Sequence, residues 1–374
     1  MGNILFATQQ QMALINSDGT GLRYLAFDVP DQATWQASGT FADGRLLMTS
    51  REARRDGPGK SFYEYFHLTP THTWIYDHAG DTLTEVALPR LAPGQTPALL
   101  LDDERLLLQV TLDEGSQIYN VALDGTDARP ITQIGEGLPY CFSLSPDGRR
   151  LAWHLAGPQG YQIWTSDLFG TDRILVAGDP DWLFFGPQWS PDAEWLVYQG
   201  CLHADDPGHD WSDLWIARPD GSEQRRLTAG QALWFGASYG PAERPGGGSN
   251  VPVWTPDGAV LVSRRTPGAR VPWVTQPQRP DVDHFNRDFL PDQAKGGTQV
   301  SRVELDGTVE LLTETREGVW DFRASASPDG GQLLFCRVPT GDSPTVWVAD
   351  MDGGNARALT KGRDELGADH PRWL

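Results

Sequence analysis

The sequence predicts an all-β protein, a seven-bladed β-propeller with four-stranded blades, in which residues 1–374 form a single domain. Three observations lead to this fold class. One kind of hairpin with an Asp-Gly turn recurs along the chain, a second kind alternates with it, and the chain ends on half of a repeat. Two hairpins in a repeat of about 45 residues are typical of propellers.

The first hairpin carries Asp-Gly or a close variant between segments of alternating apolar residues. Asp-Gly in this setting is a strong hairpin signal, because glycine adopts the positive φ that the turn needs. Its seven copies read ALINSDGTGLRYL from Ala13, TWIYDHAGDTLTEV from Thr73, QIYNVALDGTDARPI from Gln117, QIWTSDLFGTDRIL from Gln162, DLWIARPDGSEQRRL from Asp213, QVSRVELDGTVELL from Gln299 and TVWVADMDGGNARAL from Thr345.

The second hairpin turns at Ser-Pro-Asp-Gly or a related sequence. Its copies read TFADGRLLMTS from Thr40, LLLDDERLLLQV from Leu99, SLSPDGRRLAWH from Ser143, QWSPDAEWLVYQ from Gln188, VWTPDGAVLVSR from Val253 and SASPDGGQLLFCR from Ser325. The seventh is split, with RWL at the C-terminus and GNILFAT at the N-terminus. We therefore expect residues 371–374 to pair with residues 3–8, which closes the ring and removes exposed strand edges. Trp189, Trp254 and Trp373 share one repeat position and are expected to pack between blades.

Composition excludes some classes of function. A formal net charge of −20 disfavours nucleic acid as a partner, because affinity for it comes mostly from neutralising phosphates. No apolar run is long enough to span a membrane. Three widely spaced cysteines and the absence of a signal-peptide pattern predict a cytoplasmic protein, or a periplasmic one if a leader has been removed.

Long loops are predicted on only one face of the ring, where the first strand of each blade begins. They cover residues 51–71, 200–212, 235–250 and 264–297. Of the eight histidines, only His78 maps to the opposite face; the others are His67, His72, His154, His203, His209, His284 and His370. Arg51, Arg264 and Arg265 map to the same face as these loops. This asymmetry predicts a site at the mouth of the central channel, where an anion could bind.

The repeated Pro-Asp-Gly turns resemble the TolB-type propellers over the whole chain. Within that group, SNVPVWTPDG from Ser249 and ADHPRW from Ala368 resemble segments of the oligogalacturonate lyases. The resemblance implies a divalent metal, Mn²⁺ or Ca²⁺, held at His370, Glu365 and Asn250. Ala368 stands where that family has a further histidine, so the metal site would be remodelled.

The favoured function is therefore a lyase that performs β-elimination on acidic oligosaccharides containing uronic acid. Such a reaction needs a cation to neutralise the carboxylate, a base for the sugar proton and an acid for the leaving oxygen. Arg264 and Arg265 are the candidates for the first role, His203 or His209 for the second and Tyr239 for the third. The candidate substrate-binding residues are Arg51, His67, His72, His154 and His284.

An alternative function is a TolB-like propeller without catalysis, whose loops bind a partner protein or a ligand. The segment GASYG, residues 236–240, fits the Gly-x-Ser-x-Gly pattern of serine hydrolases. That pattern requires a strand–turn–helix elbow in an α/β sheet. Since it lies here in a predicted propeller loop, Ser238 is not expected to be a nucleophile.

Overall fold

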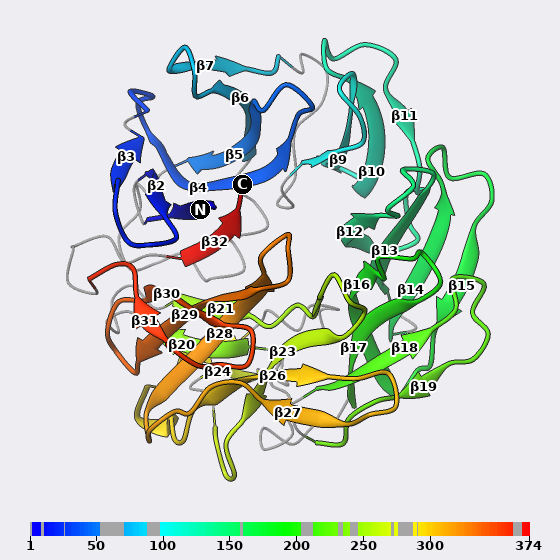
Figure 1. Cartoon of the computed structure of the whole chain (residues 1–374). Coiled ribbons are helices and arrows are strands. Elements are labelled where there is room, and N and C mark those ends of the chain that lie inside the picture. Colours follow the sequence, from blue (N-terminus) through cyan, green and yellow to red (C-terminus); the bar gives the residue numbers. More distant parts are fainter. Residues whose placement is uncertain are drawn as a thin grey trace.

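Antiparallel strands make up most of the ordered backbone in the computed structural model of this chain. The structure describes residues 2–8, 11–25, 27–52, 71–87, 98–157, 160–202, 212–230, 235–239, 246–270, 273–275, 287–289, 291–361 and 369–374. In these ranges the only helical segment is a 3-10 turn, η2 (Pro291–Gln293). Figure 1 shows the sheets arranged around a centre in chain order, with both termini on one sheet.

The two chain ends form one four-stranded sheet. Its order is β3 (Arg23–Leu25), β2 (Met12–Asn16), β1 (Asn3–Ala7) and β32 (Asp369–Trp373). Ile4 pairs with Trp373 and Leu5 with Arg372, and the Leu374 N–H donates to the Asn3 carbonyl oxygen at 2.9 Å. The predicted pairing of the chain ends is confirmed.

Two further sheets have four strands each. One consists of β4 (Gln32–Thr40), β5 (Leu46–Glu52), β6 (Thr71–Asp77) and β7 (Thr82–Glu85). The other consists of β8 (Leu99–Leu100), β9 (Arg105–Leu112), β10 (Gly115–Ala122) and β11 (Arg129–Pro130). In both, each strand pairs with its neighbour in the sequence, as tight hairpins require.

The remaining large sheets have eight strands each. The first contains β12 (Leu138–Leu144), β13 (Arg150–Gly157), β14 (Gly160–Asp167), β15 (Ile174–Ala177), β16 (Trp182–Trp189), β17 (Leu196–Leu202), β18 (Asp213–Ala217) and β19 (Arg225–Arg226). The second contains β22 (Val253–Trp254), β23 (Val260–Arg265), β26 (Thr298–Val303), β27 (Val309–Leu311), β28 (Val319–Ala326), β29 (Gln332–Pro339), β30 (Thr345–Asp350) and β31 (Arg357–Ala358). Each sheet is joined at its middle by one parallel residue pair, Tyr161 with Leu183 in the first and Thr298 with Trp320 in the second.

Two short hairpins occupy segments that were predicted as loops. They are β20 (Phe235–Tyr239) with β21 (Gly246–Ser249), and β24 (Trp273–Thr275) with β25 (Arg287–Phe289). The first hairpin lies against β28 and β29. Strand β21 reads Gly-Gly-Gly-Ser, and glycine is depleted in strands, so the sequence gives no strand signal there.

Hydrophobic residues of adjacent sheets form the core. Ile4 and Phe6 pack with Leu334 and Val346, which joins the first sheet to the last. Trp254 and Trp373 belong to clusters that join two sheets, whereas Trp189 belongs to a cluster between the two halves of the first eight-stranded sheet. The indole Nε1 of Trp254 also donates to the Gln188 carbonyl oxygen of the neighbouring strand at 3.0 Å.

A shared irregularity marks four of the first strands. Cys141 on β12, Gly186 on β16, Arg323 on β28 and His370 on β32 have positive φ, at 48°, 64°, 51° and 49°. Each lies at a register shift of its strand pair. Positive φ is uncommon for residues other than glycine. We call these positions the inner-strand bulges; they recur four residues before the serine of the Ser-Pro-Asp-Gly turn or its equivalent.

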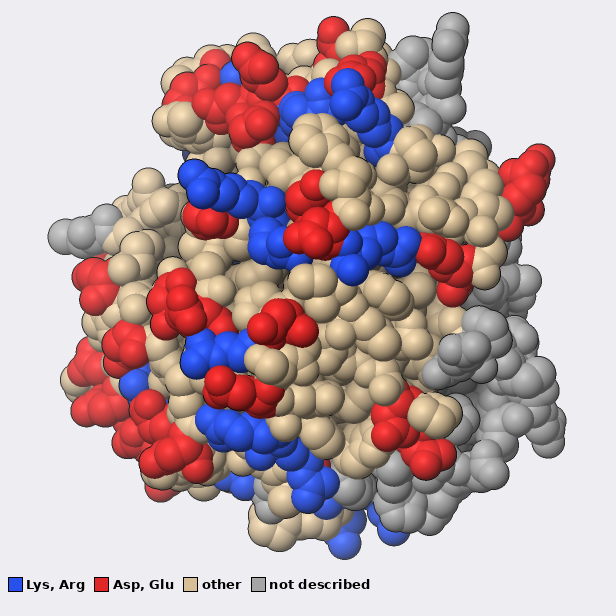
Figure 2. All heavy atoms as spheres, turned by 90° about the vertical axis from the view of Figure 1, so that its right-hand side faces the viewer, with Lys and Arg blue, Asp and Glu red and all other residues tan. Residues whose placement is uncertain are grey.

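Charges on the surface are mixed in sign. Figure 2 shows basic groups flanked by acidic groups and uncharged surface on the face it presents. Several arginines form ion pairs between neighbouring strands and turns: Arg105 with Asp127 at 3.0 Å, Arg150 with Asp172 at 2.8 Å and Arg218 with Glu194 at 2.8 Å. Exposed pairs of this kind contribute little to stability, because water screens their charges.

At Gly297 the backbones of the two halves of the second eight-stranded sheet approach each other closely. A Cβ atom at this position would lie 1.9 Å from the Val319 carbonyl oxygen. We expect Gly297→Ala to lower the free energy of unfolding by about 1–3 kcal/mol, because the backbones must separate. Gly331→Ala is the control, since its nearest neighbour atom would be 3.5 Å away. Denaturant unfolding curves measure both, and equal stability of the two variants contradicts the close approach.

Candidate functional site

Two arginines end strand β23 beside a buried carboxylate. Asp213 has no exposed surface and accepts hydrogen bonds from the Thr228 hydroxyl at 2.9 Å and the Gly230 N–H at 2.8 Å. The Arg265 Nε donates to the Gly230 carbonyl oxygen at 2.9 Å. Gly230 therefore links the arginine to the carboxylate. This hydrogen bond fixes the orientation of the Arg265 guanidinium.

Arg264 is differently placed. Its Nε is buried, and the structure as described gives this atom no hydrogen-bond acceptor. Burial lowers the pKa of the Arg264 guanidinium, while the negative charge of Asp213 opposes that effect. A guanidinium that is partly desolvated and has donors to spare binds a carboxylate more strongly than one in water. Arg264 is thus the better suited of the two arginines to hold an anionic ligand.

A buried amide network lies beside these arginines. The Asn250 side chain accepts the Ser263 N–H at 2.9 Å through Oδ1 and donates to the Ser263 carbonyl oxygen at 2.7 Å through Nδ2. Gln199 donates to the Asn250 carbonyl oxygen and accepts the Ser212 hydroxyl at 3.0 Å. The network connects β17 and β23. Both polar atoms of the Asn250 side chain thus hydrogen-bond Ser263, and its predicted role as a metal ligand stays a prediction.

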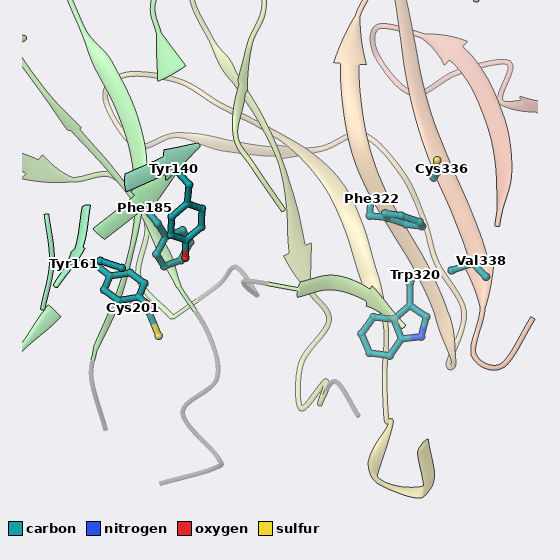
Figure 3. Packing of buried hydrophobic residues seen from close by; sticks show 9 residues of the cluster. Tyr140, Tyr161, Phe185, Cys201, Trp320, Phe322, Cys336 and Val338 are labelled. Carbon is teal, nitrogen blue, oxygen red and sulfur yellow. The ribbon is translucent and has the colours of Figure 1, made fainter. Parts of the chain in front are cut away.

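His154 is buried in an aromatic cluster. Its ring has no exposed surface and lies 3.7 Å from the Tyr140 ring, 5.9 Å from the Tyr161 ring and 6.5 Å from the Phe185 ring, measured between centroids. Figure 3 shows these three neighbours, with Trp320 and Phe322 of the same hydrophobic cluster on other strands.

The polar contact of His154 also has a structural consequence. The Gly186 N–H donates to His154 Nδ1 at 3.2 Å, so the ring fixes the inner-strand bulge of β16. An acceptor role at Nδ1 places the proton of a neutral ring on Nε2. This geometry gives His154 a packing role and offers no open face for the substrate contact predicted from the sequence.

His370 lies at the start of β32, on an inner-strand bulge, and is partly buried. His78 lies at the opposite edge of its sheet, where its Nε2 would be 3.8 Å from a Cβ on Gly44 in the β4–β5 turn. The described part of the chain contains no group of three His, Cys, Asp or Glu residues placed to hold a metal. Glu365, the predicted neighbour of His370 in the metal site, lies outside the described residues.

Arg51 and His72 lie at adjoining ends of β5 and β6. Arg51 is buried. His72 has carboxylates on both sides, with Nδ1 3.0 Å from Glu85 Oε1 and Nε2 3.9 Å from Glu52 Oε1. Two carboxylates beside the ring disfavour an anionic ligand there. The predicted substrate contact at His72 therefore has an unfavourable electrostatic setting.

The other predicted site residues are not described, so the structure does not place them. His67, His203, His209 and His284 lie outside the described residues. For Tyr239 only the backbone is described, which pairs with Gly246 in the β20–β21 hairpin. Of the predicted catalytic group, the structure therefore brings together Arg264 and Arg265. Sequence reasoning missed Asp213 and Gln199, which belong to ordinary strand patterns and gave no separate signal.

Comparison with known proteins agrees with the fold. No family model matches the sequence. A TolB homolog of Chlorobium luteolum is 24% identical over 239 residues, which is 61% of this chain and 49% of that protein. The match thus spans about half the length of the curated relative.

Two solved structures resemble the chain over nearly its whole length. An oligogalacturonate lyase in complex with manganese has a TM-score of 0.57 at 15% identity, covering 95% of this chain and 85% of that one. The oligogalacturonate lyase of Vibrio parahaemolyticus has a TM-score of 0.57 at 14% identity, covering 96% and 86%. At such identities the likeness concerns the fold alone. The chain has a TolB-like β-propeller fold, which it shares with the oligogalacturonate lyases.

Proposed function

We propose that this protein is a lyase that cleaves uronic-acid-containing oligosaccharides by β-elimination at one mouth of a seven-bladed propeller. The observation that carries the proposal is Arg264, a partly desolvated arginine whose buried Nε has no acceptor in the described structure. It ends strand β23 next to Arg265 and the buried Asp213. This is the arrangement needed to bind and neutralise a sugar carboxylate.

The seven-bladed architecture is part of the proposal. Three sheets have four strands, and each eight-stranded sheet consists of two four-stranded halves joined by a single parallel residue pair. Counting each half as one blade gives seven, in agreement with the seven copies of the first hairpin. A single residue pair between halves is what two blades in close contact would give, and it does not make a continuous sheet.

The chemistry follows from the carboxylate. Arg264 binds the carboxylate of the uronate, which acidifies the neighbouring C–H, and Arg265 keeps the backbone at Gly230 in position. His203 or His209 removes that proton, the electron pair forms a C=C bond and the glycosidic C–O bond breaks. Tyr239 donates a proton to the leaving oxygen. A divalent metal held by His370 and Glu365 would supply further Lewis acidity when bound. Arg51, His67 and His284 remain the candidates for other substrate contacts.

Variants of the arginine and of the base test the proposal. Arg264→Met should reduce kcat/KM by about 10²–10³-fold, because the developing charge loses its donor. His203→Ala or His209→Ala, whichever is the base, should reduce turnover by about 10²–10⁴-fold. Arg150→Met is the control, since Arg150 pairs with Asp172 away from the proposed site. If Arg264→Met keeps full activity, the role assigned to Arg264 is wrong.

A second function, that of a non-catalytic TolB-like interaction protein, is favoured by the match to a TolB homolog. Under this alternative the loops bind a partner protein or ligand, and no uronate is cleaved.

The three cysteines are all free, which fits the proposed cytoplasmic location. Among the described residues, no helix is long and apolar enough to cross a membrane.

A further inference from the structure

Arg372, on the strand that closes the ring, is a cation with no counter-ion among the residues that the structure describes. It lies on β32 and pairs with the fully buried Leu5 of β1, so its side chain starts on the side of the sheet that packs toward Trp35 and Met48. The described structure contains no hydrogen bond or ion pair of its guanidinium. Its nitrogens are nevertheless not sealed from solvent, since none is among the buried atoms that lack a partner.

Burial without a partner is energetically unfavourable for an arginine. The Arg372 side chain is only partly exposed, and no carboxylate of the described residues forms an ion pair with it. The chain has 50 Asp and Glu residues for 30 Lys and Arg residues, so a missing counter-ion is not due to a shortage of acidic side chains. A partly desolvated charge without a partner destabilises the folded state unless a ligand completes it.

The repeat shows how unusual this position is. Arg372 occupies the place that Ser143 holds on β12 and Ser325 holds on β28, two residues before the turn or its equivalent. The Ser143 hydroxyl donates to the Pro187 carbonyl oxygen of the next first strand at 2.8 Å. The Ser325 hydroxyl is buried and has no such acceptor within the described residues. Two hydrogen-bond donors, one on β28 and one on β32, thus lack acceptors within the described ranges.

We propose that Arg372 is the anchor of an oxyanion-binding site at the centre of the ring, separate from the site at Arg264. The ligand is a small molecule bearing a carboxylate or a phosphate. The planar guanidinium can bind either group through two parallel hydrogen bonds, which a chloride ion cannot accept in the same way. The bound anion supplies the negative charge that the described residues do not place beside Arg372.

Thermal unfolding with and without anion tests this site. Inorganic phosphate and galacturonate are the probes, each compared with chloride at equal ionic strength. At about ten times Kd, either probe should raise Tm of the wild-type protein by about 1–3 °C. Arg372→Met should have a higher Tm than the wild-type protein in chloride, because an unpaired charge is removed, and should show no response to phosphate. Arg372→Lys should keep a weaker response.

The outcomes separate this site from the proposed active site. Arg264→Met should keep the phosphate response, and Arg150→Met should keep it as well. A response lost in Arg264→Met but kept in Arg372→Met overturns the inference and leaves the lyase proposal standing. A lower Tm, or failure to fold, of Arg372→Met in chloride also overturns it, because Arg372 would then stabilise the chain without a ligand. A response that is lost in Arg372→Met and kept in Arg264→Met supports the site, and the probe that produces it identifies which oxyanion the site takes.

Discussion

Arg337→Met is expected to lower the free energy of unfolding by about 3–5 kcal/mol, because it leaves a buried carboxylate without its partner. Asp321 on β28 has no exposed surface. Arg337 on β29 donates to its two oxygens at 2.6 Å and 2.7 Å. The guanidinium also lies 4.6 Å from the centre of the Trp347 ring. Denaturant unfolding of the variant and the wild-type protein measures the loss.

The pH dependence of the variant has a definite sign. Burial holds the pKa of Asp321 above its usual value, and Arg337 opposes this effect. Without Arg337 the pKa rises further, so the folded variant binds a proton more tightly than the unfolded chain does. Its stability therefore rises as pH falls through the folded-state pKa. The difference in Tm from the wild-type protein should be larger at alkaline than at mildly acidic pH.

A matched pair provides the control for Arg337. Arg302 forms an ion pair with Asp257 at 2.9 Å, but the Asp257 side chain is 65% exposed. Arg302→Met should therefore cost only about 0–1 kcal/mol, because water solvates the carboxylate that is left behind. Equal losses for Arg337→Met and Arg302→Met would show that burial of Asp321 does not decide the effect.

Deleting residues 369–374 should lower the free energy of unfolding by roughly 3–6 kcal/mol, because β1 loses a hydrogen-bonded neighbour and apolar surface becomes exposed. The segment forms β32, and its Trp373 packs on the cluster that contains Ile4 and Phe6. Deletion also creates an exposed strand edge, so the truncated protein should self-associate more readily. Thermal unfolding and light scattering measure the two effects.

The control for this truncation is removal of Leu374 alone. Leu374 is 40% exposed and contributes one backbone hydrogen bond, from its N–H to Asn3. Its loss should change stability by no more than about 1 kcal/mol. A protein truncated by the whole segment that melts at the wild-type temperature would show that pairing of the chain ends does not hold the ring closed.

The strand pattern could be predicted because hairpin signals are local. Asp-Gly turns and alternating apolar residues lie within one segment, and the pairing of the chain ends followed from two half-repeats. The β20–β21 hairpin could not be predicted, since its partner strand is mostly glycine and it lies against β28 and β29, which are distant in sequence. Tertiary contact decides its structure.

The site was predictable only as a list of residue types on one face. Loop length and repeat position predicted the face on which Arg264 and Arg265 lie. Their closeness to each other follows from their adjacency in the sequence. No local sequence pattern indicated that the Asn250 amide would hydrogen-bond Ser263 or that His154 would accept a hydrogen bond from the Gly186 N–H. These contacts depend on the register of neighbouring strands, which local sequence patterns do not predict. The same holds for Arg372, although its departure from serine at a repeat position could have been noticed.

The most direct measurement of the proposed activity is the ultraviolet absorbance of oligogalacturonate mixtures incubated with the protein, with and without added Mn²⁺. β-Elimination creates a C=C bond conjugated to the carboxylate, so absorbance should rise with time. Mass spectrometry should show products cleaved without addition of water. Arg264→Met should slow the rise by about 10²–10³-fold, and Arg150→Met should leave it unchanged. If the wild-type protein yields no unsaturated product from any acidic oligosaccharide, with metal supplied, the lyase function is contradicted and the interaction protein becomes the better account.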